Sequence, residues 1–351
     1  MSQDREPTRT YPWDGARDPA VDLVRGVAVV CMVIAHVRVW APLDSEVVKI
    51  AITLVNNVAS PLFALVMGIS AGIVLTRRDA PVRGWVFLAR NVVRGLLLVA
   101  IGLGLQELET FVAIVLMSLG ATLVVAAPFA LLPVRVLGAV TVLVFAVGPS
   151  VNAAARAAFA PERVYSPALV DQVLQWFVLS THYRVVSLLP FVLAGVVLAR
   201  LRLTARVAAG TLAVGLVAGL AVVALRVSGR GLGVSEVVSG DVPDARLDVA
   251  LAGCACGAVI LLARWSPAQP LVTALAPVRA VGALALTAYA LHVGLIALVQ
   301  RTTAPMTPYE SWPLYAGGVL AVTVLACWAW WQLLGKGPLE RVMGLVTDRI
   351  G

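Results

Sequence analysis

The sequence predicts an all-α, polytopic membrane protein with about ten transmembrane helices in one bundle. Of its 351 residues, 60% are hydrophobic and only 13% are charged, whereas charged residues make up about a quarter of a typical soluble domain. The apolar residues form runs long enough to cross a bilayer as helices. Lys and Arg concentrate in the connections on one side of these runs, as the positive-inside rule requires.

The runs of apolar residues define the expected spans in order along the chain. They cover residues 20–40, 47–75, 84–105, 110–130, 134–150, 185–199, 207–227, 246–263, 280–299 and 313–334. The start of the chain is too polar, and the first run too long and too charged, for a cleavable signal peptide. The long connection 149–184 is expected outside. Its apolar run at 166–180 is too short to span, and we interpret it as an interfacial or re-entrant helix.

The charge bias predicts the orientation. Arg200, Arg202 and Arg206 between the sixth and seventh spans anchor that connection in the cytoplasm, which places both termini there too. We therefore expect a cytoplasmic tail at 1–19, a membrane domain at 20–335 and a second cytoplasmic tail at 336–351. This topology, in the plasma membrane, explains the net charge of +8 better than nucleic-acid binding does, and no nucleic-acid partner is expected.

The first span carries three ionisable residues, Asp22, Arg25 and His36. Asp22 and Arg25 are three positions apart and share a helix face. Arg25 and His36 are about three turns apart, so they lie on nearly the same stripe, roughly 16 Å apart along the axis. Ionisable groups inside a span usually mark a site or a pathway. The alternative is that Asp22 and Arg25 form an ion pair at the cytoplasmic end of the helix, and that the histidine only forms a hydrogen bond to a neighbouring helix.

The other two histidines, His182 and His292, are expected in the outer half, at the same depth as His36. Tyr289 is three positions before His292 and shares its helix face. We predict that these side chains, with Asn57 of the second span, line a polar chamber that receives an acceptor. The alternative is that His182 is a surface residue and that His292 packs between helices, because helix–helix packing in membranes also recruits polar side chains.

The inner half holds an arginine cluster that includes Arg83, Arg90 and Arg94. Arg90 and Arg94 are one turn apart on one face of the third span. Arginine suits phosphate because its planar guanidinium bonds bidentately and stays charged. The alternative is anchoring to anionic lipid. The four cysteines all lie in apolar runs, so neither a disulfide nor a metal site is expected.

The first span resembles the opening helix of the membrane acyltransferase superfamily, in its heparan-α-glucosaminide N-acetyltransferase-like branch, which is related to the acyltransferase-3 family. The superfamily signature is a basic residue, then ten residues, then a histidine. Here it reads VDLVRGVAVVCMVIAH, with Arg25 and His36 in the two positions. Many members carry an Asp where this chain has Ala35. Four further segments are similar to that branch: SPLFALVMGISAGI (60–73), HYRVVSLLPFVLAGVVLAR (182–200), VGALALTAYALHV (281–293) and GPLERV (337–342).

The resemblance implies transfer of an acyl group, most often acetyl, from cytoplasmic acyl-CoA to a hydroxyl or amine of an extracytoplasmic glycan, lipid or small molecule. It implies that His36 is the general base or a transient acyl carrier. Arg25, Arg90 and Arg94 would hold the donor phosphates, and Asp22 would orient Arg25.

These roles require acyl-CoA as a co-substrate and no bound cofactor. The expected partners are the lipid bilayer, acyl-CoA and the acceptor, and a homodimer is left open. Two alternatives are a multi-pass transporter, whose polar stripe would be a pathway, and a non-catalytic membrane scaffold. The transporter predicts helices broken near the midplane.

Overall fold

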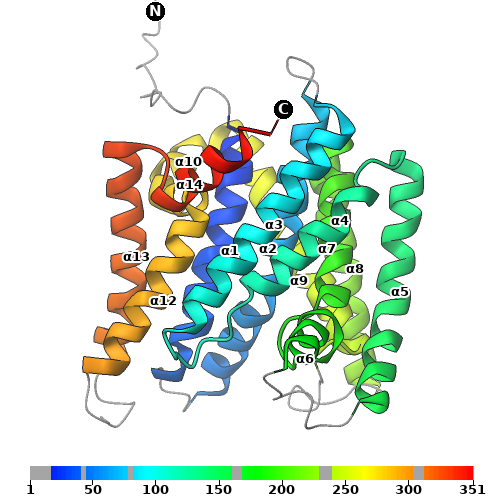
Figure 1. The fold of residues 1–351 in the computed structure, drawn as a ribbon, viewed down its shortest axis with the longest axis horizontal. Coiled ribbons are helices and arrows are strands. Elements are labelled where there is room, and N and C mark those ends of the chain that lie inside the picture. The colour runs from blue at the N-terminus through cyan, green and yellow to red at the C-terminus, as the bar shows by residue number, and fades with distance from the viewer. Residues whose placement is uncertain are drawn as a thin grey trace, which may run out of the picture.

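The computed structural model describes residues 17–40, 45–77, 82–159, 168–228, 239–302 and 312–350. The regular elements in these ranges are all helical (Figure 1). Seven helices there are long and apolar enough to cross a membrane. They are α1 (Pro19–Val37), α2 (Glu46–Thr76), α3 (Gly84–Gln106), α5 (Val134–Ala158), α8 (Ala205–Val227), α9 (Val242–Arg264) and α13 (Trp312–Leu334). The all-α, multi-pass membrane class is confirmed, although fewer helices than ten pass this test.

Two of the expected spans form helices of only 14 and 16 residues, which are too short to be counted among these seven. The run at 110–130 forms a helix only from Leu116 to Phe129 (α4), and the run at 185–199 forms α7 (Val185–Arg200). The chain before α4 is irregular, and the Val115 backbone N–H there donates to the Tyr289 hydroxyl at 3.2 Å. Both helices still pack within the bundle, where α4 contacts α3 and α7, and α7 contacts α2 and α5.

The ninth expected span, 280–299, is wrong as a single straight helix. It consists of α11 (Ala276–Ala283) and α12 (Ala285–Thr302), whose axes are bent by 94° at Leu284. If this pair counts as one span, the described ranges hold up to eight. The bend follows from close packing, because a Cβ on Gly282 would lie 1.8 Å from the Asp22 carbonyl oxygen. Only glycine lets α11 approach the first turns of α1 so closely.

The remaining elements are short and lie at the ends of the bundle. They are η2 (Arg38–Trp40), α6 (Leu169–Leu174), the π-helical η4 (Gln175–Leu179), η6 (Ser266–Ala268), α10 (Gln269–Ala274) and α14 (Pro338–Thr347). Helices α6 and η4 form the short apolar segment expected within 149–184. Helix α6 runs across the bundle rather than along it (Figure 1). Helix α14, in the expected C-terminal tail, packs on α3 and α12.

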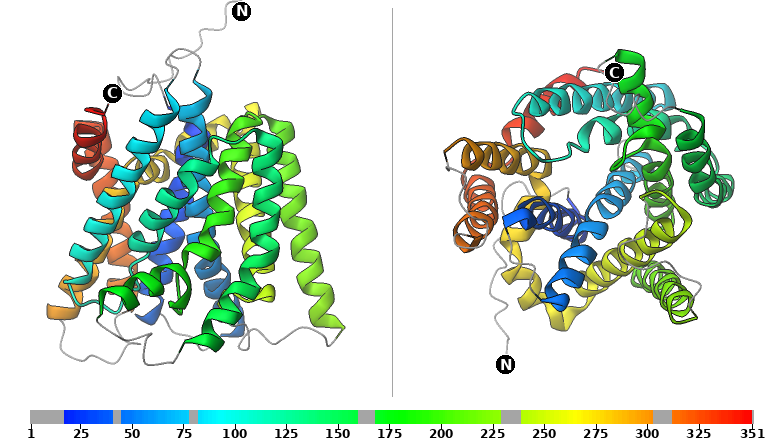
Figure 2. Two further views of the ribbon diagram at one scale, coloured as in Figure 1. Left: turned by 45° about the vertical axis from the view of Figure 1, so that its right-hand side comes forward. Right: turned by 90° about the horizontal axis from the view of Figure 1, so that it is seen from below.

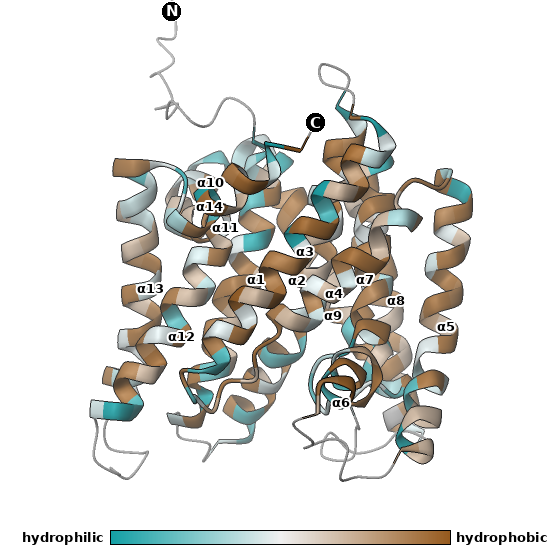
Figure 3. Ribbon diagram, viewed as in Figure 1, coloured by the Kyte–Doolittle hydropathy of each residue, from teal (hydrophilic) through white to brown (hydrophobic). Residues whose placement is uncertain are grey.

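Helix α1 is the centre of the fold. It contacts α2, α9, α11, α12 and α13 and is surrounded by other helices in the end-on view of Figure 2. Its core side chains include Val24, Ala28 and Val29, which are fully buried. Burial on most sides explains why the first span is apolar except for Asp22, Arg25 and His36. Figure 3 shows the same distribution for the whole bundle, with hydrophobic residues along the helices and most polar residues near their ends.

The two described ends of the chain, Arg17 and Ile350, lie at one end of the bundle (Figures 1 and 2). We call this end, where α1 begins, the N-face, and the end where α1 finishes the opposite face. The shared location agrees with termini on the same side of the membrane. The charge bias assigns the N-face to the cytoplasm, and that assignment stays a prediction.

Candidate active site

The N-terminus of α1 is built around two aspartates. Asp18 is the N-cap, and its Oδ1 accepts from the Ala20 backbone N–H at 3.0 Å. Pro19 follows at the first helical position, where its missing N–H costs nothing. Asp22, in the first turn, is only 7% exposed and faces two arginines. Arg17 donates to both of its carboxylate oxygens, at 2.9 and 2.8 Å.

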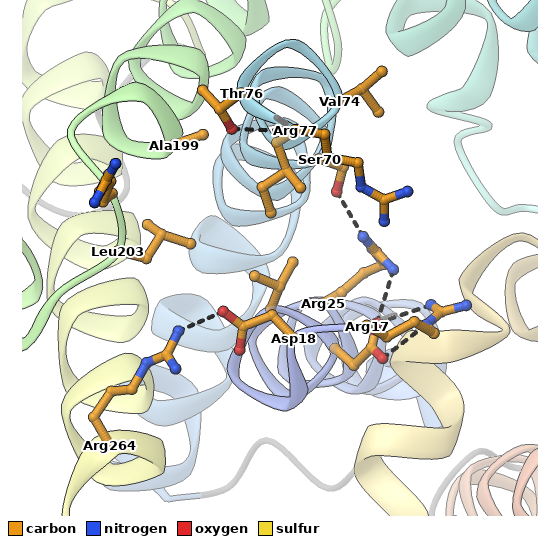
Figure 4. A pocket seen from close by; sticks show the side chains of 14 residues that line it. Arg17, Asp18, Arg25, Ser70, Val74, Thr76, Arg77, Ala199, Leu203 and Arg264 are labelled. Atoms are coloured by element: carbon orange, nitrogen blue, oxygen red, sulfur yellow. Dashed lines mark hydrogen bonds and ion pairs between the residues drawn. The ribbon is translucent and has the colours of Figure 1, made fainter. Parts of the chain in front are cut away.

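Arg25 links three helices on this side of the bundle. Its guanidinium donates to Asp22 Oδ1 at 3.2 Å and to the Gly282 carbonyl of α11 at 3.1 Å. It also donates to Ser70 Oγ of α2 at 2.6 Å (Figure 4). A charge inside a bundle needs partners of this kind. The predicted contact of Asp22 with Arg25 is therefore present, and it belongs to a network that also includes Arg17.

A cavity of about 410 Å³ leads from the N-face into the bundle. We call it the central cavity. Its basic and acidic lining residues are Arg17, Arg25, Arg94, Lys336, Glu340 and Asp348. Farther along, apolar residues such as Phe63, Met67 and Leu119 line it, and Tyr289 belongs to the same cavity. The cavity thus joins a cationic mouth to the neighbourhood of His292.

The three arginines of the inner cluster predicted to suit phosphate, Arg83, Arg90 and Arg94, occupy different places. Arg94 lines the central cavity. Arg90, one turn away, donates through Nε to the Ile350 carbonyl at 3.1 Å. Arg83 is the exposed N-cap residue of α3 and is not among the residues that line the central cavity. Of these three arginines, only Arg94 lies on the wall of the central cavity.

Glu340 of α14 holds the start of α12. Its Oε1 accepts from the backbone N–H groups of Leu286 and Thr287, at 2.9 and 3.1 Å, and its Oε2 accepts from the Thr287 hydroxyl. The first N–H groups of a helix have no partner within the helix. A carboxylate at this end also interacts favourably with the helix dipole. Glu340 therefore caps α12 at the bend, and α12 carries Tyr289 and His292.

His36 and His292 form a direct pair. His36 Nδ1 and His292 Nε2 are 2.9 Å apart, and the two rings are stacked with centroids 5.2 Å apart. Tyr289 meets the His292 ring edge-on, with centroids 5.1 Å apart. Tyr289 and His292 are fully buried, whereas His36 is partly exposed. The structure thus places these three predicted residues in one cluster.

The hydrogen bonds set the protonation of the neutral pair. His292 Nδ1 lies 3.1 Å from the Ala288 carbonyl oxygen, which can only accept. His292 Nδ1 therefore carries the proton, and its Nε2 is the acceptor for His36. It follows that His36 carries its proton on Nδ1 and donates it to His292. His36 Nε2 is then the unprotonated nitrogen, which is the form a general base needs.

Asn57 and His182 lie in a second cavity, of about 240 Å³, at the opposite face. We call it the outer cavity. Tyr183, Arg184 and Arg38 also line it. Burial, followed by the positive charges of Arg184 and Arg38, lowers the pKa of His182, which favours its neutral form.

Arg38 follows His36 by two residues and lines the outer cavity, whereas neither His36 nor His292 is among the residues that line it. The predicted chamber of three histidines is therefore divided. His292 pairs with His36, whereas His182 lines the outer cavity.

Sequence reasoning missed four residues of this arrangement, Arg17, Ser70, Lys336 and Glu340. Arg17 had a signal, because Asp18 and Pro19 mark a helix start and place Arg17 directly before it. Glu340 lies in the segment GPLERV, which the resemblance singled out without a role. Ser70 lies in the segment 60–73, which the resemblance also singled out without a role. Lys336 carries no local signal, since its position depends on how distant helices pack.

Comparison with known proteins shows the family of this chain. The family model described as heparan-alpha-glucosaminide N-acetyltransferase, catalytic, matches residues 17–230, which is more than half of the chain and includes α1 with Arg25 and His36. A second model, described as a protein of unknown function (DUF418), matches residues 196–349 and so includes α12 and α14. None of the curated proteins matches the chain. The chain belongs to the heparan-alpha-glucosaminide N-acetyltransferase catalytic family, a family of membrane acetyltransferase-like proteins.

Proposed function

We propose that this protein transfers an acetyl group from acetyl-CoA, bound from the N-face, to a hydroxyl or amine at the opposite face. The observation that carries the proposal is the His36–His292 pair, joined at 2.9 Å and in contact with Tyr289, which lines the central cavity. On the other side of the bundle, Arg38, two residues after His36 in the chain, lines the outer cavity. Two substrates could thus approach the same histidines from opposite faces.

The central cavity has the chemistry to hold the donor. Its mouth carries Arg17, Arg94 and Lys336, and Arg fits the oxygens of a phosphate group bidentately. Its deeper lining is apolar, which suits an uncharged acyl-pantetheine arm. The phosphates would remain at the N-face, and the thioester would lie near Tyr289 and the histidine pair.

The reaction then needs one proton acceptor. His36 Nε2 takes the proton from the acceptor's hydroxyl or amine as that oxygen or nitrogen bonds to the thioester carbonyl carbon. The bond between this carbon and sulfur breaks, and the CoA sulfur leaves with the electron pair. His36 returns the proton to the sulfur, which gives acetylated acceptor and free CoA. His292 holds the imidazole of His36 in the required tautomer and stabilises its positive charge during the transfer.

The bend between α11 and α12 is a broken helix of the type that the transporter alternative predicts. Its location does not fit a transport site at the membrane midplane. Gly282, two residues before the bend, packs against Asp22 and Gly26 in the first two turns of α1, which places the bend near the N-face. Glu340 satisfies the backbone groups exposed there, so the bend has a structural explanation.

Purified protein incubated with labelled acetyl-CoA tests the proposal. We expect release of free CoA, accelerated by an acceptor from an extract of envelope glycans and lipids. A general base contributes about 10²–10⁴-fold, so His36→Gln should lose at least that factor in turnover while it still binds acetyl-CoA. His182→Gln is the matched control, because it removes a histidine outside the pair and should mainly change the concentration of acceptor required. Turnover of His36→Gln close to that of the wild type would refute the mechanism.

A further inference from the structure

A third cavity, of about 510 Å³, lies between α5, α7, α8 and α9. We call it the apolar groove. Among the described residues that line it, only Thr141 and Thr211 have polar side chains. Their hydroxyls donate within their own helices, to the Leu137 carbonyl at 2.7 Å and to the Val207 carbonyl at 2.9 Å. The apolar groove therefore offers hydrocarbon surface to any molecule that occupies it.

The apolar groove opens toward the lipid. Val142 of α5 and Val214 of α8 line its edges and are 68% and 60% exposed, whereas Phe191 and Ala252 line it from the buried core. Exposed apolar side chains on spanning helices face the hydrocarbon of the bilayer. An apolar cavity of about 150 Å³ is enough to hold a benzene molecule, so the apolar groove has room for a long alkyl chain.

A narrow crevice joins the apolar groove to the outer cavity. The crevice shares Phe145 and Phe191 with the apolar groove, and it shares Ser187, Asp244 and Asp248 with the outer cavity. On α7 and on α9, the outer cavity, the crevice and the apolar groove follow one another in this order from the opposite face toward the N-face. A polar space is thus followed by an apolar one, which is the arrangement that fits an amphiphile with its head group at the opposite face.

The depth of the apolar groove matches the length of a lipid chain. Asn152, at the crevice, is seven residues from Phe145, where the groove begins on α5, and seven residues of helix extend roughly 10 Å. One leaflet of a bilayer provides about 15 Å of hydrocarbon, half of the core. A chain of ordinary membrane length, with its head group in the outer cavity, therefore extends past Phe145 into the groove.

Phe145 controls the passage from the crevice to the apolar groove. Its ring meets that of Phe191 edge-on, with centroids 5.0 Å apart. The crevice beside them has about 20 Å³, which is room for about one water molecule, so a chain passes only if one ring turns aside. Phe191 is 4% exposed and belongs to the core, whereas Phe145 is half-buried. Phe145 is therefore the ring that moves.

We propose that the acceptor is carried on an aliphatic chain, with its hydroxyl or amine in the outer cavity and its chain in the apolar groove. This inference names the class of acceptor and rests on the proposed function. The bilayer surrounds a chain with hydrocarbon as well as the groove does, so the contribution of the groove is to fix the position of the head group. A groove that held only bilayer lipid would need no connection to the polar lining of the outer cavity.

Two glycines in the wall of the apolar groove allow it to be filled. A Cβ on Gly138 or Gly210 would meet no atom of the described chain within 4 Å. The double variant Gly138→Leu, Gly210→Leu therefore occupies part of the groove and leaves its walls in place. The control is Gly104→Leu in α3, where a Cβ has the same open space and which is not among the residues that line the groove. All variants are studied as full-length protein in phosphatidylcholine nanodiscs.

The first measurement is binding, which does not depend on acyl transfer. Hexadecyl glucoside with a photoreactive diazirine near the end of its chain is irradiated with the protein, and the labelled residues are identified by mass spectrometry. Label should concentrate on Val142 and Val214 of the groove over Leu325 and Leu333, which are exposed on α13. The double variant should reduce labelling of the groove about tenfold, as added methylenes do in an apolar pocket. Phosphatidylcholine with the same diazirine should label all four positions to a similar extent.

The second measurement is turnover. The envelope extract is separated into a chloroform-soluble fraction, which contains chain-bearing molecules, and an aqueous fraction, which contains free glycans and small molecules. Release of CoA should be accelerated by the chloroform-soluble fraction only. The double variant should slow the reaction at low concentrations of this fraction about tenfold or more, because a misplaced reacting group costs up to about 10²-fold. Gly104→Leu should match the wild type.

The inference is overturned if phosphatidylcholine labels the apolar groove as selectively as hexadecyl glucoside does, since the groove would then hold ordinary lipid. It is also overturned if only the aqueous fraction accelerates release of CoA, although the proposed acyl transfer would then stand. If neither fraction accelerates release while the glucoside still concentrates in the groove, the chain-binding site is retained and the proposed function is refuted.

Discussion

Substitution of Glu340 should loosen α12 and, with it, the histidine pair. In Glu340→Ala, the backbone N–H groups of Leu286 and Thr287 lose their acceptor at 2.9 and 3.1 Å, and the Thr287 hydroxyl loses its partner. Loss of an N-cap costs about 0.5–2 kcal/mol, and a hydrogen bond to a charged group contributes about 1.5–3 kcal/mol. Water in the central cavity can replace part of this, so we expect a loss of about 2–4 kcal/mol in the free energy of unfolding. Glu340→Gln keeps one oxygen for the backbone and loses the interaction of a full charge with the helix dipole, about 1 kcal/mol.

Thermal unfolding in detergent, with turnover measured on the same samples, checks this prediction. The order of melting temperatures should be wild type, Glu340→Gln and then Glu340→Ala. Turnover should fall in the same order, because Tyr289 and His292 are carried by α12. Glu107→Ala is the control, since Glu107 is an exposed carboxylate at the end of α3 and should leave both quantities unchanged. If Glu340→Ala has the same melting temperature as the wild type, the carboxylate does not hold α12 in place and the prediction is wrong.

Three further predictions concern the donor, the bend and the topology. Arg94→Ala should weaken binding of acetyl-CoA about tenfold or more, whereas binding of acetyl-pantetheine, which lacks the nucleotide phosphates, should be unaffected. Arg83→Ala is the control. Equal losses of affinity for both donors would exclude phosphate binding by Arg94. Gly282→Val should destabilise the protein strongly, because the first added carbon would lie 1.8 Å from the Asp22 carbonyl oxygen. A variant with the melting temperature and turnover of the wild type would contradict the packing of α11 on α1. In whole cells, a membrane-impermeant maleimide should label the Thr181→Cys variant, at the opposite face, and should not label the Thr204→Cys variant, at the N-face. The reverse labelling pattern would show that the protein has the opposite orientation in the membrane.

Much of the fold was predictable because membrane spans are governed by composition and length. The apolar runs gave the class and the order of the helices, since a bilayer accepts long apolar helices with few charges. The positions at which helices end or break were less predictable from the sequence. The bend at Leu284 depends on Gly282 packing against α1 and on Glu340 capping α12, and both contacts join segments far apart in the chain.

The candidate site was predictable where its residues share one helix. The spacing of Asp22, Arg25 and His36 on α1 could be read directly from the periodicity of a helix. Contacts between helices could not be read in this way. The pairing of His36 with His292 and the separation of His182 from them depend on how α1, α12 and the chain before α7 are arranged.

The central claim is that His36 and His292 act as one unit in acetyl transfer. A double-mutant cycle on turnover, with His36→Gln, His292→Gln and the double variant at matched expression, tests it most directly. Residues that act as a unit give strongly non-additive losses. The pair described here predicts that the double variant turns over no more slowly than His36→Gln alone, because His292 acts only through His36. Losses that multiply, or a His36→Gln variant close to the wild type, would contradict this account.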